Sequence, residues 1–161
     1  MKIIRGDNQT LDYFLLYFSL SLWSYLWKKL GVSWIMKKLI VDLDGTLTRA
    51  NTSDYKNVLP RSDVIEQVRT YKEHGFQIVI ATARNMRTYE GNVGKINIHT
   101  LPIIIEWLDK HQVPYDEIIV GKPWCGHEGF YIDDRSIRPS EFAKLSYEEI
   151  TQLFEEEKAC S

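Results

Sequence analysis

The feature that most constrains this chain is a short apolar run that ends in two aspartates. Residues 34–48 read WIMKKLIVDLDGTLT, in which Asp42 closes the β-branched run 38–42 and Asp44 follows two positions later. Such a run is typical of a strand that a parallel sheet buries on both faces. In open α/β sheets the functional site lies outside the carboxyl ends of the strands. The sequence therefore predicts a buried first strand whose end presents two carboxylates.

Beyond this strand, buried strand-like runs alternate with segments of helical periodicity. Strands are predicted at 38–42, 76–81, 117–120 and 130–133, and the polar stretch 82–97 is predicted as a loop. Helices are predicted at about 62–73, at about 100–111 and from about 140 onward, with a second start signal at Ser146 that would divide the tail into two short helices. This order predicts an α/β fold: a Rossmann-like, mostly parallel sheet flanked by helices.

The N-terminus differs in composition from the rest of the chain. Residues 13–27 read YFLLYFSLSLWSYLW, which carries no charge but is shorter than the about 20 apolar residues of a spanning helix. A signal peptide is disfavoured because no small-residue cleavage site follows. We expect residues 36–161 to be the working domain. Residues 1–35 are open to three interpretations: an extension upstream of a natural start at Met36, a membrane or interfacial anchor, or a helix packed on the domain.

Charge and cysteine content narrow the classes of function. The formal net charge is −2 at pH 7, so no bulk positive field favours nucleic acid or a membrane surface as a partner. Cys125 and Cys160 form no CxxC pair, which disfavours a disulfide framework or a zinc site. We therefore expect a cytoplasmic protein with a small-molecule partner. No nucleic-acid partner is expected, nor a stable membrane partner unless residues 1–35 are an anchor.

Polar and charged side chains follow each of the predicted strands. They are Asp42 and Asp44 after the first strand, Thr82 and Arg84 after the second, Lys122 after the third, and Asp133 and Asp134 after the fourth. Four carboxylates in one cleft repel each other unless positive charge lies between them. Lys122 supplies one such charge, and Mg²⁺ is the natural remainder, since it takes a few carboxylates and is often completed by phosphate oxygens. Because an aspartate can also accept a phosphoryl group, the set predicts phosphoryl-transfer chemistry.

These residues, in this order, resemble the haloacid dehalogenase-like phosphohydrolases. The resemblance rests on DLDGTLT at 42–48, a strand that ends in Thr82, Lys122, and the acidic pair at 133–134, and it covers the chain from about residue 37 to the C-terminus. The first of these motifs is highly specific, whereas the others are weak singly and gain weight from their order. The resemblance implies a Mg²⁺-dependent phosphatase.

The resemblance also implies a role for each matched residue. Asp42 is similar to the nucleophile that takes the phosphoryl group, with one oxygen on the metal. Asp44 is similar to the general acid that protonates the leaving alcohol and then activates water, and its backbone carbonyl is the implied second metal ligand. Such an acid needs a pKa near the working pH. An aspartate at this position also favours a phosphatase over the dehalogenases of the family, which lack that acid.

The remaining matched residues are implied to hold phosphate and metal. Thr82 and Lys122 resemble the phosphate-holding residues. Asp134 is the first choice for the remaining metal ligand, with Asp133 orienting it or a metal-bound water. Arg84, Arg87 and His127 are further candidates, for substrate contacts, and a solvated loop is the alternative for these three.

Two further stretches, YEGNVGKIN and KPWCGHEGFYIDDR, resemble a small capless branch associated with capsular polysaccharide biosynthesis. The gaps at 48–60 and 85–100, where caps are inserted in this family, are too short for a cap domain. We therefore expect a cleft that is open to a large substrate or covered by the second subunit of a homo-oligomer. The implied reaction is hydrolysis of a phosphorylated sugar.

Other functions fit the residues less well. A nucleotide or nucleic-acid-end phosphatase on the same core is the main alternative, although it should show a basic groove. A non-catalytic phospho-ligand binding module would have lost an essential group, and every expected group is present. A receiver domain carries its phosphorylated aspartate after the third strand rather than the first. Dinucleotide binding is disfavoured because no G-x-G-x-x-G follows the first strand.

Overall fold

The computed structural model describes residues 37–49 and 54–159. These residues lie within one compact unit, Met36–Ser161. The interpretations of residues 1–35 concern a segment outside the described residues. None of the helices in the described part of the chain is long and apolar enough to cross a membrane.

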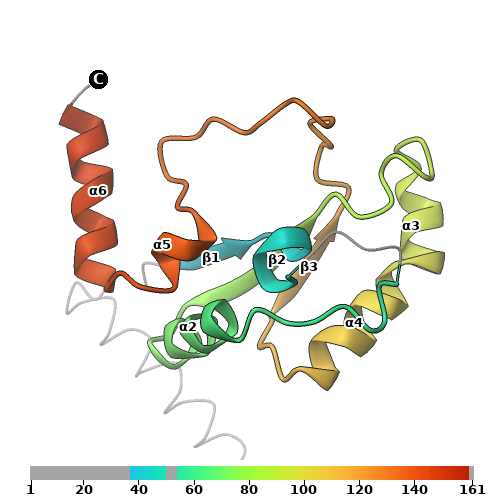
Figure 1. Ribbon diagram of the computed structural model, residues 1–161, viewed down its shortest axis with the longest axis horizontal. Helices are drawn as coiled ribbons and strands as arrows, with labels where there is room; N and C mark the ends of the chain where they lie inside the picture. Colours follow the sequence, from blue (N-terminus) through green and yellow to red (C-terminus); the bar gives the residue numbers. More distant parts are fainter. Residues whose placement is uncertain (1–36, 50–53, 160–161) are drawn as a thin grey trace, which may run out of the picture. The chain divides into compact units, whose positions relative to one another are not determined.

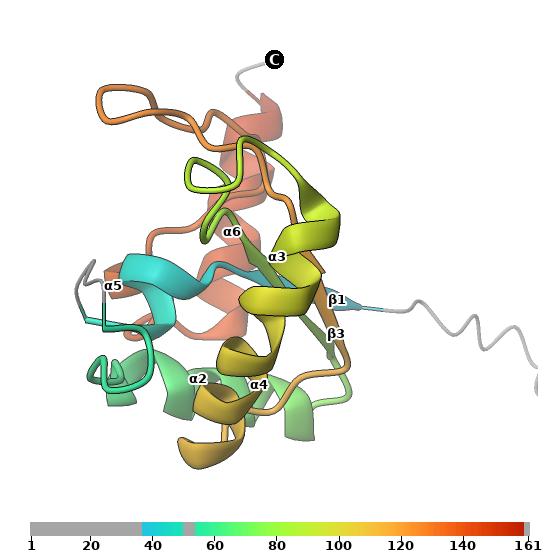
Figure 2. The ribbon, with the colours of Figure 1, turned by 90° about the vertical axis from the view of Figure 1, so that its right-hand side faces the viewer.

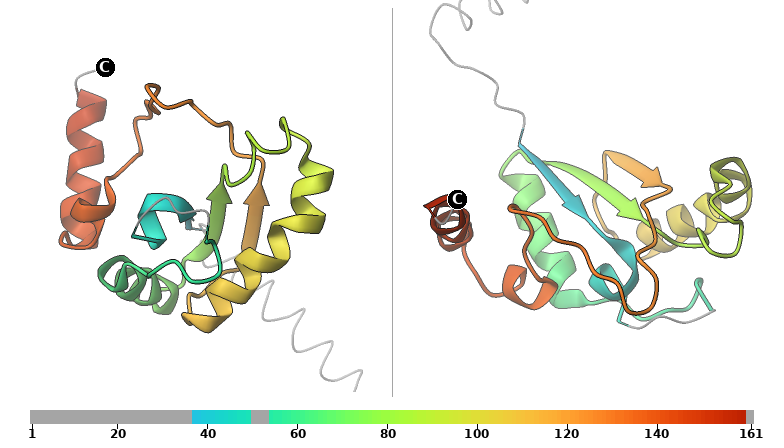
Figure 3. Two further views of the ribbon diagram at one scale, coloured as in Figure 1. Left: turned by 45° about the vertical axis from the view of Figure 1, so that its right-hand side comes forward. Right: turned by 90° about the horizontal axis from the view of Figure 1, so that it is seen from above.

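A three-stranded parallel sheet forms the centre of the unit. Its strands are β1 (Lys38–Val41), β2 (Gln77–Thr82) and β3 (Glu117–Val120), in the order β1-β2-β3. Ile40 pairs with Val79, and Ala81 pairs with Ile119. All three strands point the same way, so their carboxyl ends meet at one edge (Figure 3). The predicted α/β class and the mostly parallel sheet are confirmed, and the first three strands agree with the prediction to within about one residue.

The helices surround this sheet and pack through the apolar positions that their periodicity marks. They are α2 (Ser62–Glu73), α3 (Val93–His99), α4 (Leu101–Lys110), α5 (Pro139–Phe142) and α6 (Tyr147–Ala159). Helix α2 contacts β2 and α5, whereas α3 contacts β3 and runs on into α4 (Figures 1 and 2). The tail divides into two helices around Ser146, as the second start signal indicated.

The core lies between β2 and the apolar faces of α2 and α4. Ile78 and Ile80 of β2 are fully buried, and so are Val64 and Val68 of α2 and Ile104 of α4. Side chains of the two C-terminal helices join this cluster, including Phe142 and Ile150. Burial of these apolar groups is the dominant favourable term in folding. In the described residues no cap domain is evident.

Helix α3 was not predicted from the sequence. Residues 82–97 were assigned to a loop because the stretch is polar and contains two glycines. In the structure Asn92 accepts a hydrogen bond from the backbone N–H of Lys95 at 3.0 Å, which is the N-cap contact of α3. Ile96 is fully buried and attaches the short helix to the core. One N-cap contact and one buried side chain therefore stabilise a helix whose sequence lacks a strong periodic signal.

The prediction of a strand at 130–133 is wrong. The chain from 121 to 138 runs as a loop from the end of β3 to α5 (Figures 1 and 3), with Phe130 77% exposed and Ile132 89% exposed. Asp133 instead forms a turn, because its carboxylate accepts the backbone N–H of Arg135 at 2.7 Å. A run of three apolar residues fits a buried strand only if a sheet edge receives it, and sequence composition carries no information about that partner.

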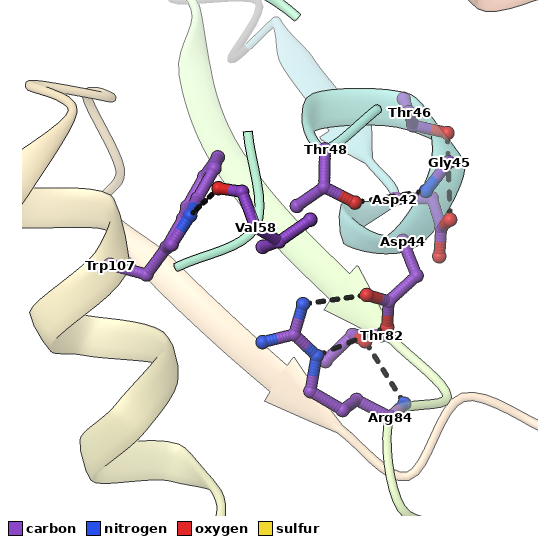
Figure 4. A network of polar contacts seen from close by, with 9 residues as sticks. All are labelled: Asp42, Asp44, Gly45, Thr46, Thr48, Val58, Thr82, Arg84 and Trp107. Atoms are coloured by element: carbon purple, nitrogen blue, oxygen red, sulfur yellow. Dashed lines mark hydrogen bonds and ion pairs between the residues drawn. The ribbon is translucent and has the colours of Figure 1, made fainter. Parts of the chain in front are cut away.

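Trp107 links α4 to the segment that leads into α2. Its ring is 1% exposed, and its indole N–H donates to the carbonyl of Val58 at 2.8 Å (Figure 4). We expect Trp107→Phe to lower the free energy of unfolding by about 1–3 kcal/mol, because the buried carbonyl loses its donor. Urea denaturation followed by circular dichroism measures this change. Trp124→Phe, at a position 43% exposed, serves as the control and should change stability by no more than about 0.5 kcal/mol.

Candidate active site

The chain turns sharply where β1 ends, and this turn presents the two aspartates. The segment η1 (Leu43–Leu47) is one wide turn closed by a hydrogen bond from the N–H of Thr48 to the carbonyl of Leu43 at 3.0 Å. Leu43 and Leu47 are fully buried and attach the turn to the core. Gly45 has φ +78°, a left-handed conformation that glycine adopts without steric cost. With Leu43 buried, the residues on either side of it, Asp42 and Asp44, lie at the carboxyl edge of the sheet.

Asp42 is the carboxylate that Lys122 contacts. Its side chain is 28% exposed, and its Oδ1 lies 3.1 Å from Nζ of Lys122. Thr46 Oγ1 lies 3.5 Å from the other carboxylate oxygen. Burial raises the pKa of Asp42 above its ordinary value; the positive charge and hydrogen bond of Lys122 oppose this shift, and the negative charge of Asp44 adds to it. Lys122 therefore compensates part of the cost of keeping this carboxylate charged.

Asp44 is paired with Arg84 rather than with Lys122. Nη2 of Arg84 lies 2.6 Å from Oδ1, and Nε lies 3.1 Å from Oδ2, so the guanidinium binds both carboxylate oxygens (Figure 4). The Arg84 side chain is fully buried and lies over the ring of Tyr55, with 4.3 Å from the guanidinium carbon to the ring centroid. Among the described residues, its Nη1 has no hydrogen-bond partner. The sequence analysis indicated a substrate contact for Arg84; the structure shows its contacts with Asp44 and Tyr55, and the substrate contact stays a prediction.

Thr82 and Lys122 are brought beside these groups by the pairing of β2 with β3. Thr82 is 1% exposed, and its hydroxyl accepts the backbone N–H of Arg84 at 3.0 Å. The carbonyl of Thr82 accepts the backbone N–H of Lys122 at 3.1 Å, which continues the strand ladder beyond Val120. These bonds place Lys122 at the end of β3, within reach of Asp42 at the end of β1. Three neighbouring strand ends thus bring these side chains together, whereas the sequence analysis expected a fourth strand end with Asp133 and Asp134.

Asp133 and Asp134 are not gathered with the first two aspartates. Both are exposed and lie in the loop between β3 and α5, because their segment turns instead of pairing with the sheet. Among the described residues, no three His, Cys, Asp or Glu side chains form a group able to hold a metal ion. The Asp42 carboxylate and the Asp44 backbone carbonyl remain as candidate donors, because Arg84 binds both carboxylate oxygens of Asp44. Two oxygen ligands fit Mg²⁺, which keeps several waters and is usually completed by substrate phosphate.

Arg87 and His127 meet at the same edge, although 40 positions separate them. Nη1 of Arg87 lies 3.2 Å from Nε2 of His127, and both side chains are exposed. Tyr131, which the sequence did not mark as a site residue, lies beside Lys122, with Nζ 4.3 Å from the ring centroid. Tyr55 was missed as well. Both are single aromatic residues in loops, and no spacing rule identifies such residues before the fold is known.

The raised pKa of Asp42 predicts a pH-dependent effect on stability. Between the ordinary aspartate value of 3.8 and the higher native value, the native state binds more protons than the unfolded state, so stability falls as pH rises through that window. Without divalent metal, Asp42→Asn should remove this loss. Its stability relative to the wild type is expected to increase with pH across the window and then level off in urea denaturation.

Asp63→Asn is the matched control for this experiment. The hydrogen bond from Arg61 holds the pKa of Asp63 below its ordinary value, so Asp63 contributes stability that is lost as pH falls. Asp63→Asn should therefore lose stability relative to the wild type at neutral pH and recover it in acid. A pH-independent difference for Asp42→Asn would contradict the assigned burial of the Asp42 carboxylate.

Comparison with known protein families gives a match over the first part of the described chain. A family model described as haloacid dehalogenase-like hydrolase matches residues 39–107. The matched segment contains Asp42, Asp44, Thr82 and Arg84, and it ends before Lys122. No curated protein matched the chain.

Three solved structures resemble the chain. A crystal structure of a target protein from Vibrio cholerae is 83% identical, with a TM-score of 0.75; the match covers 76% of this chain and 99% of that one. A chain of the Pnkp1/Rnl/Hen1 RNA repair complex is 19% identical, with a TM-score of 0.39 over 55% of this chain and 27% of that one. A second structure of a Pnkp1/Rnl/Hen1 complex gives 21% identity and a TM-score of 0.40, over 70% of this chain and 36% of that one. The last two likenesses are too distant to carry a functional argument.

Proposed function

We propose, from the match of residues 39–107 to a family model described as haloacid dehalogenase-like hydrolase, that this chain is a Mg²⁺-dependent phosphomonoester hydrolase with an aspartyl-phosphate intermediate. The observation that carries this proposal is the placement of two carboxylates at one strand end, each held by its own cation. Lys122 contacts Asp42 at 3.1 Å and Arg84 contacts Asp44 at 2.6 Å. Unequal environments for two neighbouring carboxylates are typical of sites that divide nucleophilic and proton-transfer roles between them.

In the first half-reaction a carboxylate oxygen of Asp42 attacks the phosphorus atom. The bond from phosphorus to the ester oxygen breaks, and the leaving alkoxide takes a proton from the Asp44 carboxyl. In the second half-reaction Asp44 removes a proton from water, and the hydroxide attacks the phosphorus of the acyl phosphate. Inorganic phosphate leaves, and the Asp42 carboxylate is regenerated. The partial burial that raises the pKa of Asp42 also strips water from the attacking oxygens.

The cations assist the two half-reactions in different ways. Lys122 lies where the phosphoryl group must arrive and neutralises charge on it while orienting Asp42. Thr82 closes the base of the site with a buried hydroxyl. Mg²⁺, when bound to the Asp42 carboxylate and the Asp44 backbone carbonyl, supplies further neutralisation of the phosphoryl oxygens. Transfer of a phosphoryl group depends mainly on such positioning and charge compensation.

A phosphorylated sugar of capsular polysaccharide synthesis is the proposed substrate. Support comes from the resemblance of YEGNVGKIN and KPWCGHEGFYIDDR to the capless capsule-associated branch. The described residues show no cap domain, which suits a substrate that extends beyond its phosphate. A nucleotide or nucleic-acid end is the second candidate on the same core. A panel of hexose phosphates, nucleoside monophosphates and 3′-phosphorylated oligonucleotides, compared by kcat/KM, separates the two.

Asp42→Asn tests the reaction itself. With Mg²⁺ and a hexose phosphate, the wild type is expected to release inorganic phosphate, and removal of the metal with EDTA should abolish this release. Asp42→Asn should lower kcat by on the order of 10³-fold or more, because the amide cannot act as the nucleophile. Asp109→Asn, on helix α4, is the matched control and should retain full activity. An Asp42→Asn variant with wild-type kcat would refute the mechanism.

Arg84→Met tests whether Arg84 positions the general acid. The substitution keeps an unbranched apolar stem in the buried position but removes the guanidinium and with it both bonds to Asp44. For a hexose phosphate, whose leaving alcohol needs a proton, kcat should fall about 10- to 100-fold. For p-nitrophenyl phosphate, whose leaving group needs little protonation, the decrease should be much smaller. Equal losses for both substrates would assign Arg84 a structural role only, and Arg84→Lys should recover part of the activity.

A further inference from the structure

We propose that Trp124, Arg87 and His127 form a binding platform for the sugar ring of the leaving group. This inference rests on the proposed phosphatase function, since it names where the rest of the phosphomonoester binds. The three residues are called the Trp124 platform below. The ligand class is a cyclic sugar phosphate, whose ring offers a C–H face together with several hydroxyl groups.

The platform is built from two loops that follow neighbouring strands. Arg87 lies in the loop after β2, and Trp124 and His127 lie in the loop after β3. The rings of Trp124 and His127 meet edge to face, with centroids 5.2 Å apart. The guanidinium carbon of Arg87 lies 5.8 Å from the centroid of Trp124, and its Nη1 lies 3.2 Å from Nε2 of His127. Two of these three contacts join the loop after β2 to the loop after β3, which is more than a solvated loop requires.

The platform begins two residues beyond the lysine that holds the nucleophile. Lys122 contacts Asp42 at 3.1 Å and lies 4.3 Å from the ring centroid of Tyr131. The hydroxyl of Tyr131 donates to the carbonyl of Pro123 at 2.5 Å, which closes the base of this loop beside Lys122. Two residues of chain span at most about 7 Å, so the backbone of Trp124 lies within that distance of the backbone of Lys122, whose side chain contacts Asp42.

The chemistry of the platform matches a sugar ring. Trp124 remains 43% exposed despite its contacts, so much of its indole surface is available to a ligand. An indole packs against the apolar C–H face of a sugar, while its own N–H remains a donor. Arg87 and His127 add donors beside the ring, and a few directed polar groups around an apolar surface are what small-molecule sites use for orientation. A nucleobase would also stack on indole, but the flanking donors favour a ligand that carries hydroxyl groups.

Paired substrates with and without a ring test the proposal on the full chain. Glucose 1-phosphate carries the ring, and glycerol 1-phosphate carries a phosphate ester and hydroxyl groups but no ring. For Trp124→Leu, the ratio of kcat/KM for glucose 1-phosphate to that for glycerol 1-phosphate should fall about tenfold, which corresponds to about 1.4 kcal/mol. The fall should lie mainly in KM. Trp124→Phe, which keeps an aromatic face, should retain most of the ratio.

Phe130→Leu is the matched control, because Phe130 lies in the same loop and is 77% exposed, and it should leave the ratio unchanged. An unchanged ratio in Trp124→Leu would overturn the proposal. A larger selective loss for adenosine 5′-monophosphate than for glucose 1-phosphate would overturn the assignment to sugars and identify a nucleobase platform.

A binding measurement separates failure of the platform from failure of the proposed reaction. Glucose 1-phosphate is titrated into the wild type, Trp124→Leu and Phe130→Leu by calorimetry. The platform is supported if Trp124→Leu binds glucose 1-phosphate about tenfold more weakly than the wild type and Phe130→Leu binds it equally well. This holds even where the wild type releases no phosphate. Phosphate release with equal binding by all three proteins would leave the phosphatase function intact and overturn the platform.

Discussion

Two carboxylates held at one strand end are the constraint on which the rest of this site depends. Asp42 and Asp44 lie on either side of a fully buried leucine, Leu43, so both carboxylates lie at the same edge of the sheet. Their mutual repulsion must be compensated, and two cations from other strands do so. Lys122 after β3 contacts the first, and Arg84 after β2 contacts the second. The parallel order of the three strands is what brings these cations within reach.

The two ion pairs differ in ways that matter for chemistry. Lys122 is one-quarter exposed and contacts a single oxygen of Asp42, so it can move its contacts to an incoming phosphoryl group. Arg84 is fully buried beneath Asp44 and binds both oxygens, which fixes that carboxylate in place. A buried charge pair is costly to break from one side only. The site therefore combines one adaptable cation with one rigid cation, and the adaptable cation lies next to the loop that carries the Trp124 platform.

Sequence reasoning succeeded where local composition and periodicity determine the element. The strands at 38–41, 77–82 and 117–120, helix α2 and helix α4 follow from short β-branched runs and from apolar spacing. Sequence reasoning failed where a single contact decides whether a helix or strand forms. Helix α3 depends on the Asn92 cap and on burial of Ile96, and the 130–133 segment forms no strand because Asp133 turns the chain. Such contacts are too local, or too dependent on a distant partner, to leave a periodic signal.

The sequence by itself determined the first carboxylate pair, the threonine, the lysine and the strand ends that carry them. Each of these follows from residue type and from its position after a β-branched run, and both are local properties. Only the tertiary structure decided that Arg84 binds Asp44 across 40 positions, that Arg87 meets His127, and that Tyr131 lies beside Lys122. The physical reason is that the sequence offers many possible partners for a charged or aromatic side chain in a loop. The packing of the sheet selects one of them.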